Sequence, residues 1–255
     1  MKVPTEDTIT LTLKAGKILT KLGILYLIPV TLGDDNIVHV LPISVIQLAQ
    51  QLEFFVVENE KTARHFLSTI KTVKPVRELT LLTLNQHTVD KDVMALLAPL
   101  LAGNNLGIMS EAGCPGIADP GAKLVELAHS KGIKVVPLVG PSSILLGLMG
   151  SGLNGQQFTF LGYLPVDKAA RNLRLKEIEK RSQQQFETQI FIETPYRNQH
   201  MLEAILTSCN ENTRLCVACN VSLESELIMT KTIANWRKSK QPDLHKQPTV
   251  FLLLA

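Results

Sequence analysis

The sequence predicts an α/β protein with two domains, and three observations lead to this prediction. The chain has 255 residues, which is longer than one typical domain and short for three. Short apolar segments alternate with helical segments in its first half, as in a mostly parallel sheet covered on both faces. A charged helical segment at residues 167–185 belongs to a second α/β unit. We therefore expect an N-terminal extension at residues 1–22 and domains at residues 23–138 and 139–255.

The elements of the first half are expected from the pattern of their apolar residues. Short apolar runs bounded by glycine, proline or polar residues predict strands. These strands lie at residues 23–30, 53–58, 80–84, 106–110 and 134–138. Apolar residues that recur every three or four positions predict the helices between them. These helices lie at residues 42–51, 62–70, 90–102 and 121–130, with Asp90 as a possible N-cap.

The second half is expected to alternate in the same way. Helical period predicts helices at residues 142–149, 167–185 and 196–208. Runs rich in β-branched and aromatic residues predict strands. These strands lie at residues 158–163, 190–193, 215–221, 226–230 and 250–254.

The composition indicates a globular chain without a membrane span. Hydrophobic residues make up 45% of the chain and charged residues 19%, a balance that excludes a disordered protein. The formal net charge of +3 permits an anionic partner but is too small to indicate nucleic-acid binding by itself. Residues 135–166 carry no charged side chain, yet their glycines and prolines divide them into short elements.

The four cysteines favour a reducing, cytoplasmic compartment. They are too few and too clustered for a disulfide framework, and no signal peptide is recognisable. Cys216 and Cys219 have the spacing of a zinc or redox pair, but no second pair of cysteines or histidines lies at ligand distance in the sequence. We expect two buried strand cysteines and no metal.

Two loops that follow predicted strands carry the strongest sign of a binding site. Residues 110–121 read SEAGCPGIADPG and residues 139–143 read VGPSS. Glycines let a ligand approach the backbone, prolines restrict the unfolded chain, and ligands bind at the carboxyl ends of parallel strands. The hydroxyls and free amides of the second loop suit an anion. A plain turn and ordinary N-capping remain the alternatives.

These loops resemble segments of the tetrapyrrole methylase superfamily, on the branch of ribosomal RNA small-subunit methyltransferase I. Residues 110–121 are similar to SDAGTPGISDPG, and residues 140–143 are similar to GPSA. Further similar segments follow in the same order along the chain. They are LYLIP at 25–29 with Leu32 and Gly33, Val57 and Glu58 with Thr62, Arg64 and His65, FLGYLP at 160–165, FIETPYR at 191–197 and the closing strand after Pro248.

The resemblance implies a mostly parallel N-terminal sheet, a mixed C-terminal sheet and a ligand cleft between two domains. It implies a methyltransferase that binds S-adenosylmethionine (SAM) in this cleft, acts on small-subunit ribosomal RNA and forms a homodimer. Backbone groups are expected to dominate the contacts with SAM. By position, the residues expected to make them are Pro29, Gly33, Glu111, Ala112, Gly113, Ile117, Ser142, Ser143, Pro248 and Thr249.

Three carboxylates near the expected cleft are candidates for a general base. They are Glu111, Asp119 and Glu193. An alcohol acceptor such as a ribose 2′-OH gains about 10²–10⁴-fold in rate from a positioned base. Loop capping by Asp119 and a salt bridge between Glu193 and Arg197 are the alternatives.

The methyl acceptor is the least determined part of this interpretation. The sequence departs from the family near Asn220, where residues 219–224 replace a charged RELTK segment. RNA phosphates would suit two basic clusters, for which a solvated helix face is the alternative. The clusters are Lys168, Arg171, Arg174, Lys176, Lys180 and Arg181, and Arg237, Lys238 and Lys240. A small acceptor such as a corrinoid, or a SAM-binding regulatory or scaffold protein without turnover, remain open.

Overall fold

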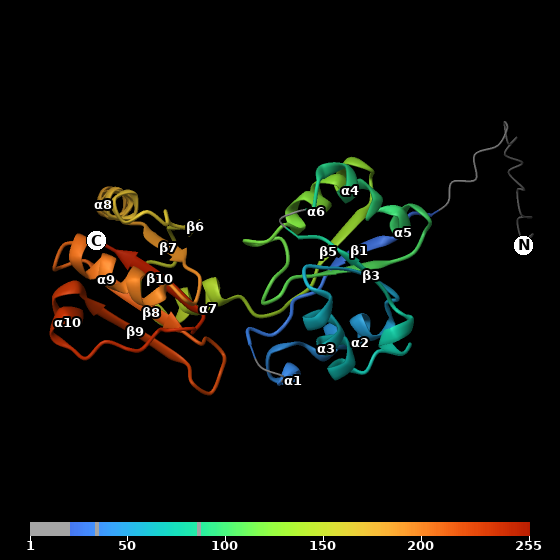
Figure 1. Cartoon of the computed structure of the whole chain (residues 1–255), viewed down its shortest axis with the longest axis horizontal. Helices are drawn as coiled ribbons and strands as arrows, with labels where there is room; N and C mark the ends of the chain where they lie inside the picture. The colour runs from blue at the N-terminus through green and yellow to red at the C-terminus, as the bar shows by residue number, and fades with distance from the viewer. Residues whose placement is uncertain (1–20, 34–35, 86–87) are drawn as a thin grey trace, which may run out of the picture.

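The protein consists of two halves, each built on a five-stranded sheet (Figure 1). The computed structural model describes residues 21–33, 36–85 and 88–255. The halves lie side by side, and the segment between β5 and α7 joins them. The expected boundary between residues 138 and 139 falls in this segment and stays a prediction. Most of the expected N-terminal extension lies outside the described residues.

The first sheet is parallel throughout, with the strand order β3-β2-β4-β1-β5. The sequence-based expectation of a parallel sheet is confirmed. Its strands are β1 (Ile24–Leu27), β2 (Phe54–Val57), β3 (Thr80–Thr83), β4 (Leu106–Met109) and β5 (Lys134–Pro137). Its helices are α1 (Ile37–Val40), α2 (Ile43–Gln51), α3 (Glu60–Ile70), the 3-10 helix η1 (Val76–Glu78), α4 (Asp90–Ala95), α5 (Ala98–Leu101) and α6 (Gly121–Ser130).

Helices cover both faces of this sheet because each strand buries side chains on both sides. In β2, Phe55 and Val57 belong to the core under α2 and α3, whereas Val56 belongs to the core under α4, α5 and α6. Gly107 in β4 leaves room for this packing, since a Cβ there would lie 3.0 Å from a ring carbon of Phe55. The carboxyl ends of β1, β2 and β4 therefore meet at one edge of the sheet.

The structure differs from the expected helices at residues 90–102, which form two short helices instead of one. Pro99 sits in the first turn of α5. Proline has no backbone N–H to continue a helix from the preceding turn, so α4 ends before it. The short elements α1, η1 and α10 were not predicted, because three to six residues are too few to show a helical period.

The second sheet is mixed, with the strand order β6-β7-β10-β8-β9. β6 and β7 are parallel and the other pairs are antiparallel, as the resemblance implied. Its strands are β6 (Phe158–Tyr163), β7 (Thr188–Ile192), β8 (Arg214–Cys219), β9 (Leu227–Thr232) and β10 (Thr249–Leu254). Its helices are α7 (Ser143–Ser151), α8 (Lys168–Gln185), α9 (Asn198–Ser208) and α10 (Ile233–Lys238).

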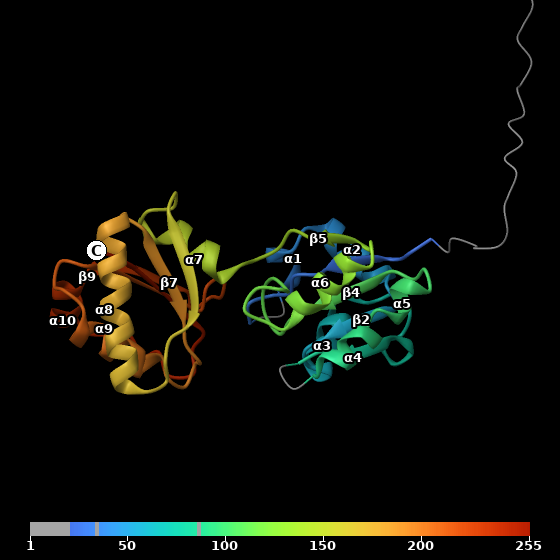
Figure 2. The ribbon, with the colours of Figure 1, turned by 90° about the horizontal axis from the view of Figure 1, so that it is seen from above.

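The helix α7 lies on the face of the second sheet that is turned toward the first half (Figure 2). Its glycines allow a close approach, since a Cβ on Gly147 would lie 3.2 Å from the Cβ of Ala218. The other three helices pack on the opposite face. Residues 135–166 thus form β5, α7 and β6, and no helix among the described residues is long and apolar enough to cross a bilayer.

Candidate functional site

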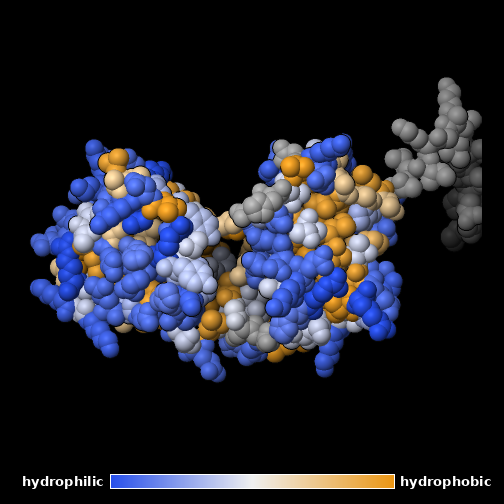
Figure 3. Space-filling model, in the orientation of Figure 1, coloured by the Kyte–Doolittle hydropathy of each residue, from blue (hydrophilic) through white to orange (hydrophobic). Residues whose placement is uncertain are grey.

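A cavity of about 330 Å³ lies between the two halves, at the carboxyl ends of the parallel strands. Figure 3 shows the hollow between the halves from outside. The first half contributes the loop after β1, the end of β2 and the loop after β4. The second half contributes the start of α7 and the neighbouring ends of β6, β7, β8 and β10. Ligands bind at this edge in parallel α/β sheets.

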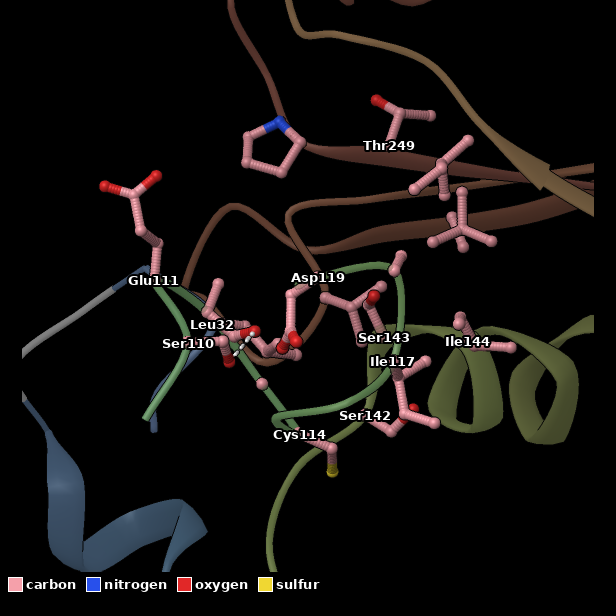
Figure 4. Close-up of a pocket in the computed structure, with 18 of the residues that line it drawn as sticks. Leu32, Ser110, Glu111, Cys114, Ile117, Asp119, Ser142, Ser143, Ile144 and Thr249 are labelled. Atoms are coloured by element: carbon pink, nitrogen blue, oxygen red, sulfur yellow. Dashed lines mark hydrogen bonds between the residues drawn. The ribbon is translucent and has the colours of Figure 1, made fainter. Parts of the chain in front are cut away.

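Most of the residues expected to contact SAM line this cavity together. They are Glu111, Ala112, Gly113, Ile117, Ser142, Ser143, Pro248 and Thr249. The carboxylate candidates Asp119 and Glu193 line it as well. In Figure 4, Ile117, Ser142 and Ser143 gather at the start of α7, and Thr249 lies across the cavity from them on β10.

Two residues expected at the cleft, Pro29 and Gly33, are not among those lining the cavity. Pro29 packs under the segment between the halves, because a Cβ on Gly140 would collide with its ring. Gly33 lines a second cavity in the N-terminal half. Pro29 therefore packs against the segment that joins the halves. Contact of Pro29 or Gly33 with a ligand stays a prediction.

The loop after β4 is held in shape by Asp119. Its two carboxylate oxygens accept hydrogen bonds from the amide of Gly116 at 2.9 Å, and one of them also accepts from the amide of Gly121 at 2.6 Å. Gly113 has a φ of +71°, a conformation that side chains disfavour. A Cβ on Gly113 would lie 3.2 Å from Leu32. This geometry favours the loop-capping role of Asp119.

The second loop is fixed by hydrogen bonds at the start of α7. The Ser142 hydroxyl accepts a bond from the amide of Leu145 at 3.5 Å, which makes it the N-cap of the helix. The Cys114 thiol donates to the carbonyl of Pro141 at 3.3 Å and ties the two loops together. The N-capping that was the alternative interpretation of this loop is thus present, and it places Ser142 and Ser143 in the cavity wall.

Glu193 forms a buried ion pair in the wall of the second half. Its side chain is 1% exposed, and its Oε1 accepts from Arg197 Nη2 at 2.5 Å and from the Thr194 amide at 2.6 Å. The salt bridge with Arg197, given above as the alternative to a catalytic role, is thus present. Glu193 Oε2 is buried without a hydrogen-bond partner among the described residues. A buried carboxylate oxygen of this kind is costly unless a ligand donates to it.

Glu58, at the end of β2, is a cavity residue that sequence analysis did not select. Its Oε2 accepts from the Glu111 amide at 3.4 Å. Burial raises the pKa of its carboxyl, and the nearby Glu111 and Asp119 carboxylates add to the increase. Burial likewise raises the pKa of Asp119, against the effect of its two backbone amides. The signal that could have found Glu58 is its place directly after a buried strand that runs parallel to β4.

Replacing Glu58 by glutamine is expected to stabilise the ligand-free protein at pH 8. The pKa of Glu58 is raised above its ordinary value of 4.5 in the folded state. At pH values between the ordinary and the raised pKa, the folded protein therefore binds more protons than the unfolded chain, and the free energy of unfolding falls as the pH rises through this range. Since the side chain is only partly buried, the gain should stay near 1 kcal/mol or below, at most about 2–4 °C in Tm. The measurement is thermal unfolding at pH 8 and pH 4. An equal gain at both values would contradict the assignment.

The arginines of the two basic clusters bind groups of the protein itself. Arg171 is buried and donates to a main-chain carbonyl at 2.9 Å. Arg174 and Arg181 pair with glutamates at 3.0 and 2.8 Å. Arg237 donates to two carbonyls at the end of α9. The lysines of these two clusters are exposed and have no ion pair among the described residues; they are Lys168, Lys176, Lys180, Lys238 and Lys240.

The cysteine pair lies in β8, where the side chains of Cys216 and Cys219 enter different cores. Both are buried, and burial raises the pKa of each thiol. The expectation of two buried strand cysteines is confirmed. Within the described ranges, no group of three or more histidine, cysteine or acidic residues is placed to hold a metal ion.

Comparison with known proteins identifies the family. No protein-family model matches the chain. The ribosomal RNA small subunit methyltransferase I of Vibrio cholerae is 30% identical over 215 residues, which cover 83% of this chain and 69% of that protein. The chain belongs to the ribosomal RNA small subunit methyltransferase I family. The ribosomal RNA small subunit methyltransferase I of Buchnera aphidicola is 27% identical over 239 residues, which cover 92% of this chain and 79% of that protein.

Two solved structures share the fold of this family member. The methyltransferase CobJ has a TM-score of 0.61 at 16% identity, covering 91% of this chain and 94% of CobJ. The cobalt precorrin-4 methyltransferase CbiF has a TM-score of 0.56 at 14% identity, covering 90% of this chain and 94% of CbiF. Both confirm the expected tetrapyrrole methylase-like fold with its two sheets.

Proposed function

We propose that this family member transfers a methyl group from SAM to small-subunit ribosomal RNA, with a ribose 2′-OH as the acceptor. The name of its relatives supports both the reaction and the RNA. The observation that carries the proposal is the cavity between the halves, where most residues expected to contact SAM come together. We take the exposed lysines on α8, at the last residue of α10 and just after it as the sites of contact with RNA phosphates.

The residues around the cavity fit SAM. Its sulfonium and ammonium groups are positively charged, and Glu58, Glu111 and Glu193 bring carboxylates to the wall. Glu193 Oε2 is buried and has no hydrogen-bond partner among the described residues. Apolar side chains for the adenine ring are supplied by both halves, and the volume is that of a small-ligand pocket. Bound SAM supplies an already activated methyl group, so the protein mainly aligns the acceptor with it.

Among the three candidates for a general base, we propose Glu111 for that role. Asp119 is engaged by two backbone amides and Glu193 by Arg197, whereas the Glu111 side chain is exposed at the wall of the cavity. As the acceptor oxygen takes the methyl group, its proton must leave, and a carboxylate at hydrogen-bond distance can take it. Such a base contributes about 10²–10⁴-fold in rate.

We also propose that the protein works as a homodimer in the cytoplasm. Apolar side chains stand exposed on and before α7, with Met149 at 79%, Val139 at 73% and Leu145 at 51% exposure. Exposed apolar groups that gather on one element mark association surfaces. Analytical ultracentrifugation of the purified protein distinguishes a monomer from a homodimer. A monomer at micromolar concentration would contradict the proposed homodimer.

Incubation with methyl-tritiated SAM and small ribosomal subunits from a strain that lacks the protein is expected to label their RNA. A 2′-O-methyl group blocks alkaline cleavage of the following phosphodiester, so the labelled nucleotide should be recovered in an alkali-resistant dinucleotide. Heated protein and an excess of S-adenosylhomocysteine serve as controls.

Absence of label in RNA would contradict the proposed acceptor. Label in a corrinoid under the same conditions would assign the alternative small acceptor. Tight binding of SAM without any product across these acceptors would assign the regulatory or scaffold role.

A further inference from the structure

A second cavity, which we call the α3 cavity, lies in the N-terminal half beside the first. Its volume is about 410 Å³. It is lined by the loop after β1, the first turns of α3 and the end of β4. Ser110 and Glu111 line both cavities. A molecule in the α3 cavity therefore lies directly beside a molecule in the cavity between the halves.

The floor of the α3 cavity is apolar. Val30, Ile37, Phe66 and Met109 line it, and each is at most 8% exposed. A flat ring or the carbon face of a sugar can pack on such a floor without leaving a buried polar group unpaired. The floor alone would suit many apolar ligands, so the residues of the rim decide which chemical class of ligand the cavity binds.

The rim of the α3 cavity is polar and basic. Lys61, Thr62 and His65 lie in the first two turns of α3 and are exposed. Lys61 has no ion pair among the described residues, unlike the arginines on α8. The eleven-residue helix α3 begins here, so its dipole adds positive potential to that of the lysine. Together these features favour an anion at the rim.

We propose that the α3 cavity binds the acceptor nucleotide of the RNA, with its base on the apolar floor and its phosphate at Lys61. This inference rests on the proposed function, because it names the subsite for the RNA substrate. The nucleotide's ribose then lies between floor and rim, next to Glu111 in the shared wall. Glu111 can face the acceptor hydroxyl from this position while the methyl donor occupies the neighbouring cavity.

The chemistry of the cavity favours a nucleotide over the other acceptor classes. One apolar floor with a lysine, a histidine and a helix start on one side matches a single base with one or two phosphates. A macrocycle with several carboxylates needs a wider floor and cations on several sides. A base that is stacked inside a duplex cannot enter a protein cavity. We therefore expect the bound nucleotide to be single-stranded or flipped out of the duplex.

Two substitutions at the rim test the inference in the full-length protein. Lys61→Gln removes the charge, and Thr62→Trp fills the mouth of the cavity with a side chain that still suits an exposed helix position. Lys131→Gln is the matched control, because Lys131 is an exposed lysine after the far end of α6, at the opposite edge of the sheet. The probe is the small ribosomal subunit, titrated in the presence of S-adenosylhomocysteine, together with methyl transfer at saturating SAM.

Lys61→Gln is expected to weaken binding of the subunit about three- to tenfold and to reduce the slope of log Kd against log salt by about 0.7–0.9. Thr62→Trp should lower kcat/KM for RNA more than tenfold. The Kd for SAM and the Tm should stay at the wild-type values in both. Unchanged RNA binding in Lys61→Gln, or equal losses in Lys131→Gln, would overturn the inference. If the wild type binds RNA through Lys61 without methylating it, the proposed methyl transfer fails, whereas the α3 cavity stands as a subsite that binds RNA.

Discussion

Replacing Arg197 by methionine is expected to lower the free energy of unfolding by about 3 kcal/mol, or roughly 6–12 °C in Tm. The substitution leaves the Glu193 carboxylate buried without its cation, since its side chain is 1% exposed. An uncompensated buried charge is among the costliest changes in a protein. Thermal and urea unfolding of the ligand-free protein measure the loss.

The double variant Glu193→Leu with Arg197→Met separates stability from ligand binding. Replacing both members of a buried pair by apolar residues is often neutral, so most of the stability should return. Affinity for SAM should stay reduced, because the double variant removes the Glu193 carboxylate from the wall of the cavity that we assign to SAM. Full recovery of SAM binding in the double variant would show that Glu193 serves the fold alone.

Replacing Asp119 by alanine is expected to weaken SAM binding by roughly 30- to 150-fold. The carboxylate accepts hydrogen bonds from the amides of Gly116 and Gly121, and bonds to a charged group contribute about 1.5–3 kcal/mol each. Without them the loop samples other conformations. Ordering the loop when SAM binds then reduces the binding free energy by about 2–3 kcal/mol. Calorimetric titration with SAM measures this change.

Asparagine at position 119 is the matched control for that loss. It keeps one carbonyl oxygen as an acceptor, so Asp119→Asn should lose less than tenfold in affinity. If Asp119 acted as the base instead, Asp119→Asn would keep SAM binding and lose turnover by about 10²-fold or more. That result would move the catalytic role from Glu111 to Asp119.

The loops of the site could be predicted from the sequence because residues that lie close together in the chain indicate them. Residues 110–121 combine glycines, prolines and two carboxylates directly after a buried strand, and these residue types indicate a turn that a ligand can approach closely. Ser142 was recognisable as a cap for the same reason. Pro99 shows the limit of local patterns, since the apolar period continued through a residue that cannot continue the helix.

Side-chain partners could not be expected from the sequence. Arg171 and Arg237 belong to basic clusters by composition, yet both donate to carbonyls of the protein. Pro29 matched a family motif, but it packs under Gly140 outside the lining of the cavity. Each of these outcomes depends on which elements lie against one another, and a window of the sequence carries no such information.

The sequence by itself determined the α/β class, the parallel first sheet, the two loops of the candidate site and the family. Those properties follow from periodicity and turn chemistry over a few residues, together with the order of motifs along the chain. Only the tertiary structure decided that Glu58 joins Glu111 and Glu193 at one cavity and that the α3 cavity adjoins it. The reason is physical: strand order and the docking of two sheets bring together residues more than a hundred positions apart, and packing alone fixes those distances.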